Sequence, residues 1–140
     1  MAIWSTTIDL EKLNSRSKGS MGGFLDIEMV EIGDDFMVGR MPVDERTKQP
    51  FGVLHGGASV VLAESIGSVA SICVVDITKF RCFGLEINSN HLRPVTSGFV
   101  YAKVTPLHLG KTTHVWDIKI TNEEGKLVNV SRLTMAIVPF

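Results

Sequence analysis

The stretch LHGGASVVLAESIGSVAS, which runs from Leu54 to Ser71, decides the fold of this chain. It is apolar on nearly every side, and Glu64 is the only charged side chain between Gly56 and Val75. An α-helix that is hydrophobic all round is buried in a protein core or in a membrane. Burial of a carboxylate costs free energy unless the group is paired or neutralised, so a lone Glu64 in such a helix requires a reason.

The helical periodicity places Glu64 among small and polar side chains. At 3.6 residues per turn, one stripe of the helix contains Gly57, Val61, Glu64, Ser68 and Ser71. Small and polar residues on one stripe indicate that another group approaches this side of the helix closely. Glu64 is therefore a candidate functional carboxylate, and the alternative is that it is a paired structural acid.

His55, Gly56 and Gly57 come directly before the apolar run, at the expected N-terminus of the helix. The first backbone N–H groups of a helix have no intrahelical partner, and the helix dipole favours negative charge there. Glycine also lets a substrate come close to the backbone. Donors at this point could stabilise an oxyanion, although the two glycines could equally serve only to form a tight turn.

Length and composition exclude several classes of protein. The chain has 140 residues, typical of one domain with a sizeable core, and its 44% hydrophobic and 21% charged residues indicate a globular chain. A net charge of −1 gives no general attraction to nucleic acid or anionic lipid. Cys73 and Cys82 are too few for a disulfide framework or a metal-ligand cluster, and free thiols suit a reducing cytosol.

The N-terminal segment MAIWSTTIDLEKLN lacks the basic region followed by an apolar run that marks a signal peptide. Residues 58–75 are near the lower length limit for a membrane span and include Glu64 and several serines. A lone membrane span would also leave the alternating segments that follow without a packing partner. We expect a cytoplasmic protein that binds neither membrane nor nucleic acid and carries no metal or cofactor.

The elements expected on either side of this helix follow from turn residues and hydrophobic periodicity. Before it we predict a short helix capped by Thr7 and ending at Asn14, with Leu10 and Leu13 turned inward. A loop over 14–23, with room for a further helical turn, then leads to strands 24–32 and 36–43, joined at Gly33. The polar loop 44–52 precedes the long helix, expected over 55–77.

Four strands are predicted after the long helix, and they are separated by glycine and proline signals. Their expected ranges are 81–92, 99–109, 112–121 and 126–138. Within the third of them, Trp116, Ile118 and Ile120 alternate with more polar residues, which is typical of a strand covered on one face. The pattern predicts one α+β domain over residues 1–140, with one antiparallel sheet wrapped on one helix. A second copy of the protein would most simply cover the remaining helix surface.

The chain resembles the hotdog-fold acyl-CoA thioesterases in two segments. They are QPFGVLHGGASVVLAESIGSVAS at 49–71 and INSNHLRPV at 87–95. Within that family it is most similar to the 4-hydroxybenzoyl-CoA and phenylacetate types of thioesterase. Two groups are similar along nearly the whole chain: those that hydrolyse 1,4-dihydroxy-2-naphthoyl-CoA, and those that clear misacylated aryl carrier proteins in enterobactin synthesis.

This resemblance implies a helix wrapped by a six-stranded sheet, homodimers with a continuous sheet, and usually a dimer of dimers. It implies that Glu64 is the catalytic carboxylate and that the Gly57 N–H polarises the thioester carbonyl. Gln49 and His55 would orient the acyl group or a departing product, and Ser68 would orient water or the nucleophile near Glu64. His91 would lie by the thioester and the pantetheine arm, although a strand histidine can also be purely structural.

A thioester is already activated, so its hydrolysis needs little more than an oxyanion donor and a carboxylate that deprotonates water or attacks the carbonyl directly. Coenzyme A carries phosphates, and Arg93 and Lys111 lie beside turns where they could bind them, unless they are ordinary solvated charges. We expect an acyl-CoA thioesterase that prefers aromatic acyl groups. The alternatives are a carrier-protein proofreading thioesterase, a hotdog dehydratase, against which the Gly57-to-Glu64 spacing argues, and a non-catalytic acyl-CoA binding module.

The expected helix also restricts how one active site can be built. Gly57 and Glu64 are seven residues apart, so their backbones are separated by roughly 10 Å along one helix. Both would have to act on one thioester carbon, with reacting atoms about 3 Å apart. Two antiparallel helices around a two-fold axis would place Gly57 of one chain opposite Glu64 of the other, so we expect the homodimer to share its active sites.

Overall fold

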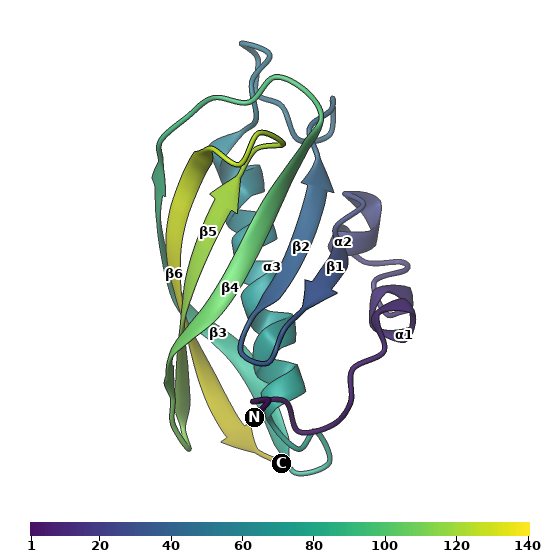
Figure 1. Ribbon diagram of the computed structural model, residues 1–140, viewed down its shortest axis with the longest axis vertical. Coiled ribbons are helices and arrows are strands. Elements are labelled where there is room, and N and C mark those ends of the chain that lie inside the picture. Colours follow the sequence, from purple (N-terminus) through teal and green to yellow (C-terminus); the bar gives the residue numbers. More distant parts are fainter.

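Helix α3 (Gly56–Val74) is the central element, and a six-stranded antiparallel sheet curves around it (Figure 1). This computed structural model describes residues 1–140. The other elements, in chain order, are α1 (Leu10–Ser15), α2 (Met21–Phe24), β1 (Glu28–Ile32), β2 (Met37–Pro42), β3 (Phe80–His91), β4 (Phe99–Leu109), β5 (Thr113–Thr121) and β6 (Leu127–Pro139). The predicted α+β hotdog architecture is confirmed.

The strands follow the order β1-β2-β4-β5-β6-β3, so β1 and β3 form the two edges of the sheet. Hairpins connect β1 to β2, β4 to β5, and β5 to β6. Strand β3 directly follows the long helix in the chain and pairs with β6, the last strand. Each of the four strands predicted after α3 is present with bounds within two residues of those expected. In β5 the side chains of Trp116, Ile118 and Ile120 are fully buried while their neighbours are partly exposed, as predicted.

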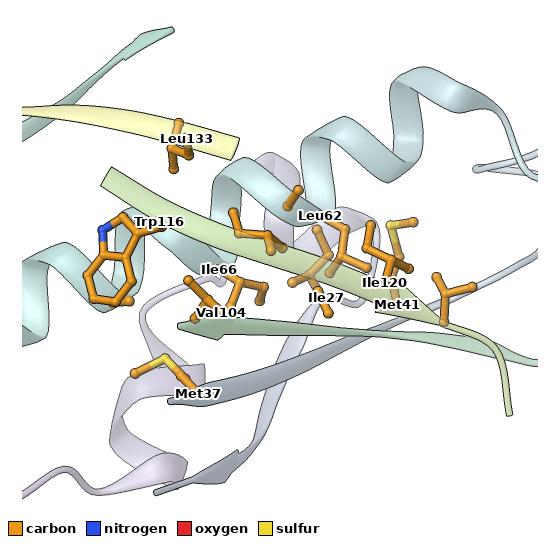
Figure 2. Packing of buried hydrophobic residues seen from close by; sticks show 14 of the residues in the cluster. Ile27, Met37, Met41, Leu62, Ile66, Val104, Trp116, Ile120 and Leu133 are labelled. Carbon is orange, nitrogen blue, oxygen red and sulfur yellow. The ribbon is translucent and has the colours of Figure 1, made fainter. Parts of the chain in front are cut away.

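The concave face of the sheet packs closely on α3. Figure 2 shows Leu62 and Ile66 of the helix among apolar side chains from the strands, and neither has any exposed surface. Two glycines permit this approach. A Cβ atom added at Gly39 of β2 would lie 2.1 Å from Ile66 Cδ1, and one added at Gly67 of α3 would lie 2.5 Å from Leu133 Cδ2.

Three predicted boundaries need correction. Helix α1 begins after Asp9, whose Oδ1 accepts from Lys12 N–H at 3.2 Å, so Asp9 and not Thr7 is the cap. Residues 21–24 form helix α2, which delays the start of β1 to Glu28. Helix α3 ends at Val74 and not near residue 77, because Val75 adopts an extended conformation.

Within one chain, helix α3 is buried on one side only. Its core-facing side is fully covered, but Ile72 is exposed and several residues on the remaining surface, including Glu64 and Ser68, are half-buried. Its length and composition alone would suffice for a membrane span. In this fold, however, its apolar face is packed against five strands of the sheet, as in the core helix of a globular protein.

Ser71, predicted to lie on the small-residue stripe with Glu64, belongs to the core. Its Oγ accepts from Trp116 Nε1–H at 2.7 Å and lies 2.9 Å from His114 Nδ1. Burial lowers the pKa of His114, which favours the neutral imidazole. His114 therefore has a structural role at the C-terminal end of α3.

Candidate active site

The N-terminus of α3 carries a histidine cap. His55 precedes the helix in an extended conformation, and its Nδ1 accepts from the Gly57 N–H at 2.8 Å. The donor predicted to polarise a carbonyl is thus bonded to a side chain of its own chain, while the Gly56 N–H has no partner. Rotation of the exposed His55 ring would release the Gly57 N–H beside it, giving two adjacent donors for an incoming oxygen.

Gln49 is held in the turn that leads into this helix. The backbone of residues 47–55 folds back on itself, with Gln49 N–H donating to Val53 O at 2.9 Å and His55 N–H donating to Thr47 O at 2.8 Å. The Gln49 side-chain Oε1 accepts from Phe51 N–H. Gly52, with φ of +83°, provides the left-handed residue that closes the turn. Gln49 therefore lies in the turn that leads to the helix end capped by His55.

The Glu64 carboxylate lies against strand β3 at Gly84. A Cβ atom added at Gly84 would stand 2.5 Å from Glu64 Oε2, so only glycine leaves space for the carboxylate at this position. None of the ion pairs in the chain includes Glu64. The carboxylate is half-buried and has no cationic partner, which argues against a paired structural acid.

Ser68 lies one turn further along α3, close to the same point of the sheet. Its hydroxyl contacts Met135 Sδ at 3.7 Å, and Met135 is the cross-strand neighbour of Gly84. Glu64 and Ser68 therefore face one site on β3 and β6. The predicted role of Ser68 beside the carboxylate stays a prediction.

His91 ends strand β3 beside the start of α3. A Cβ atom added at Gly56 would stand 2.8 Å from His91 Nε2, so the imidazole lies against the helix N-terminus. Gly56, Ser59, His91 and Arg93 line a cleft of about 400 Å³ at this end of the molecule. This cleft brings the predicted residues His91 and Arg93 next to the unpartnered Gly56 N–H.

Lys111 lies elsewhere. It sits in the turn between β4 and β5, three residues before His114, which contacts Ser71 in the last turns of α3. His91 and Arg93 lie instead at the first turn, so the length of the helix separates the two predicted phosphate contacts (Figure 1). Within one chain Lys111 and Arg93 do not form one binding surface.

Sequence reasoning missed Gly84 and Asn129, which contact two of the predicted site residues. An isolated glycine inside a strand pattern signals a bulge or a close approach, and Gly84 stands at a register shift in β3. Asn129 is fully buried, and its side-chain amide lies 3.1 Å from His91 Nδ1. The sequence signal for Asn129 is its position in the strand pattern. Alternate residues of a strand face the same side, so Asn129 faces the same side as Leu133 and Met135, where an apolar residue would be expected.

Neither cysteine is poised as a nucleophile. Cys73 and Cys82 are free thiols, and burial raises the pKa of both, which disfavours the reactive thiolate. No group of three or more His, Cys, Asp or Glu side chains is placed to hold a metal ion.

Known proteins match this chain along nearly its whole length. A family model described as the thioesterase superfamily matches residues 51–129. A 1,4-dihydroxy-2-naphthoyl-CoA hydrolase of Escherichia coli K12 is 55% identical over 135 residues, covering 96% of this chain and 98% of the relative. The proofreading thioesterase EntH of Cronobacter turicensis is 43% identical over 142 residues, with 96% and 98% covered. A crystal structure of a mutant of thioesterase PA1618 from Pseudomonas aeruginosa superposes with a TM-score of 0.98 at 52% identity, covering 99% of this chain and 100% of the other.

Proposed function

The chain belongs to the thioesterase superfamily and is a thioester hydrolase, and from this premise we propose that it hydrolyses acyl-CoA thioesters carrying aromatic acyl groups. The observation that carries the proposal is the unpaired Glu64 carboxylate held over Gly84. A non-catalytic binding module would have no need for an uncompensated carboxylate on an apolar helix. The proposed location is the cytoplasm, in keeping with the two free thiols.

In the proposed reaction, Glu64 either removes a proton from water that attacks the thioester carbon or attacks that carbon itself to form an anhydride, which water then cleaves. Backbone N–H groups at the start of α3 stabilise the oxyanion. The carbon–sulfur bond breaks, coenzyme A leaves as a thiolate that takes up a proton, and the acyl group departs as the free acid. Ser68 orients water or the carboxylate, while Gln49 and His55 orient the acyl group.

We propose that a second copy of the chain completes each site. Glu64 lies two helical turns from Gly57, roughly 10 Å along α3, whereas both must reach one thioester carbon. Strand β3, beside which Glu64 lies, is an open edge of the sheet and exposes Phe83 and Leu85 at 57% and 62%. Pairing of two β3 edges would bury these side chains and bring the α3 helices of both copies together.

The phosphates of coenzyme A are proposed to bind Arg93 at the mouth of the cleft beside Gly56. Lys111 lies near the opposite end of helix α3 from Arg93, so it can reach the same ligand only from another copy of the protein. A dimer of dimers would offer that arrangement. Membranes and nucleic acid have no part in the proposed reaction.

A carrier-protein thioester is the second candidate substrate. The 43% identity to a proofreading thioesterase favours it, and the 55% identity to a CoA thioester hydrolase favours coenzyme A. Both relatives match nearly the whole chain. The two candidate substrates differ in the molecule that carries the pantetheine arm, which is either coenzyme A or a carrier protein. The two substrates would share the Glu64 chemistry and differ only in contacts beyond the arm.

A thiol-release assay tests the proposal. One aromatic and one aliphatic acyl group should each be offered on coenzyme A, on an aryl carrier protein and on free pantetheine. We expect the highest kcat/KM for the aromatic acyl-CoA. Preference for the carrier-protein thioester would support the second candidate, whereas higher kcat/KM for acetyl- or long-chain acyl-CoA would overturn the aromatic assignment.

A further inference from the structure

Four polar side chains form a closed hydrogen-bond network between the ends of β3 and β6. Ser89 and His91 of β3 are the direct cross-strand neighbours of Ser131 and Asn129 of β6. Asn129 and Ser131 are 0% and 1% exposed, so their side-chain polar atoms depend on partners inside the chain, whereas Ser89 is half-buried and His91 is exposed. Such a network restricts where each proton can be.

The protons can be assigned one by one. Ser131 Oγ–H donates to Asn129 Oδ1 at 2.7 Å, and because that uses its only proton, Ser89 Oγ–H must donate to Ser131 Oγ at 2.9 Å. The Asn129 amide N–H groups then donate to Ser89 Oγ at 2.7 Å and to His91 Nδ1 at 3.1 Å. His91 Nδ1 is therefore an acceptor, and the ring proton is on Nε2.

The reverse orientation of the Asn129 amide is disfavoured by the same accounting. It would place Oδ1 against Ser89 and His91, and one of the two amide N–H groups would lose its partner in a buried position. An unsatisfied buried donor is costly. The observed orientation leaves no buried side-chain polar atom of the chain unpaired.

We propose that Asn129 is a positioning residue that holds His91 as the neutral tautomer protonated on Nε2, so that His91 donates a hydrogen bond into the cleft beside Gly56. In this form Nε2 cannot act as a base. The ring offers a donor to a carbonyl oxygen of the acyl thioester or its pantetheine arm, and Glu64 is left as the only base. The inference rests on the proposed function for the identity of that acceptor, but not for the tautomer.

The tautomer can be measured directly on the unliganded protein. In the full chain labelled with ¹⁵N-histidine, two-dimensional NMR should show His91 Nε2 as a protonated nitrogen and Nδ1 as an unprotonated one near neutral pH. The His91→Gln variant assigns these signals. A protonated Nδ1 in the wild-type protein would overturn the proposal whatever the enzyme hydrolyses.

Asn129→Asp supplies the complementary test, because a carboxylate at this position accepts a hydrogen bond from an Nδ1–H group and has no N–H of its own to donate to Nδ1. His91 should then carry a proton on Nδ1, and kcat/KM for the aromatic acyl-CoA should fall about tenfold, the size of one lost hydrogen bond. In the His91→Gln background the same substitution should change kcat/KM no further. An unchanged tautomer, or equal losses in both backgrounds, would show that Asn129 does not act through His91.

Asn90→Asp is the matched control. Asn90 adjoins His91 in β3 but is exposed on the opposite face of the strand, so the substitution adds the same charge without entering the network. It should leave the His91 signals unchanged. The His114 signals give an internal control for the fold, since that ring bonds Ser71 at the other end of α3. Absence of thioesterase turnover, with the tautomer as assigned, would count against the proposed function alone.

Discussion

At the scale of single residues, the contact between Glu64 and Gly84 holds a carboxylate on the side of an apolar helix. Glu64→Gln retains the shape of the side chain and Glu64→Ala removes it, but both abolish the proposed base or nucleophile. We expect kcat to fall by about 10² to 10⁴, as for loss of a positioned base, with an unchanged melting temperature. Steady-state thiol release and thermal unfolding measure the two quantities. Turnover near the wild-type rate in Glu64→Ala would exclude the mechanism.

Gly84→Ala tests the placement of the same carboxylate without removing it. The new Cβ would stand 2.5 Å from Glu64 Oε2, so the carboxylate has to turn away, which a half-exposed side chain can do at little cost in stability. A displacement of about 1 Å at a reacting group can lower the rate by up to about 10²-fold. We therefore expect kcat to fall by about 10-fold to 10²-fold.

Two controls accompany Gly84→Ala. In the Glu64→Gln background it should lower kcat no further, because no carboxylate remains to be displaced. Gly22→Ala, where the nearest atoms would be 3.9 Å from the added Cβ, should leave kcat unchanged without lowering stability. Loss of folding in Gly84→Ala, with no effect specific to Glu64, would contradict the proposed spatial role of this glycine.

At the scale of elements, the sequence predicts the helix and the sheet because turn residues and hydrophobic periodicity agree along the chain. Boundaries fail where several residues can do the same local task. Thr7 and Asp9 are both competent helix caps, and tertiary packing selects Asp9. The predicted end of α3 is wrong for a different reason: the apolar run continues to Val75, but the backbone becomes extended at Val75 and leads into β3.

The candidate site shows the same division between local and long-range information. Gln49, His55 and Gly57 gather at one helix end because they are close in sequence. Asn129 reaches His91 only through the pairing of β3 with β6, across 38 residues of chain. The engagement of the Gly57 N–H by His55 depends on a side-chain rotamer, which periodicity does not report.

The close contact between α3 and β2 gives a prediction at this scale. In Gly39→Ala the added Cβ would meet Ile66 Cδ1 at 2.1 Å in a fully buried position, and overpacking of this kind costs about 1 to 3 kcal/mol. Ile66→Val removes that Cδ1 methyl group. Although Ile66→Val alone should cost about 0.5 to 1.5 kcal/mol, the double variant should be more stable than Gly39→Ala. Urea unfolding measures all three, and additive losses would contradict the contact.

At the scale of the whole molecule, the proposed shared site can be tested by mixing two damaged proteins. Gln49→Ala impairs the helix end and Glu64→Ala removes the carboxylate, which in the proposed dimer come from different chains. After co-refolding, random pairing gives mixed dimers with one intact and one doubly damaged site, so activity should return to about a quarter of the wild-type value. Tagged subunits verify the exchange. Full exchange without recovery would assign each site to one chain.

The open edge of β3 has a consequence for the newly made chain. Its outer backbone donors and acceptors lie beside Phe83 and Leu85, and an exposed apolar edge of this length is a template for pairing with any other extended segment. If the proposed dimer forms, a freshly folded protomer is therefore at risk of aggregation until a second copy covers this edge. In that dimer, slow assembly at low protein concentration would lower the amount of soluble protein as well as the activity, so the expression level would help to set the yield of active enzyme.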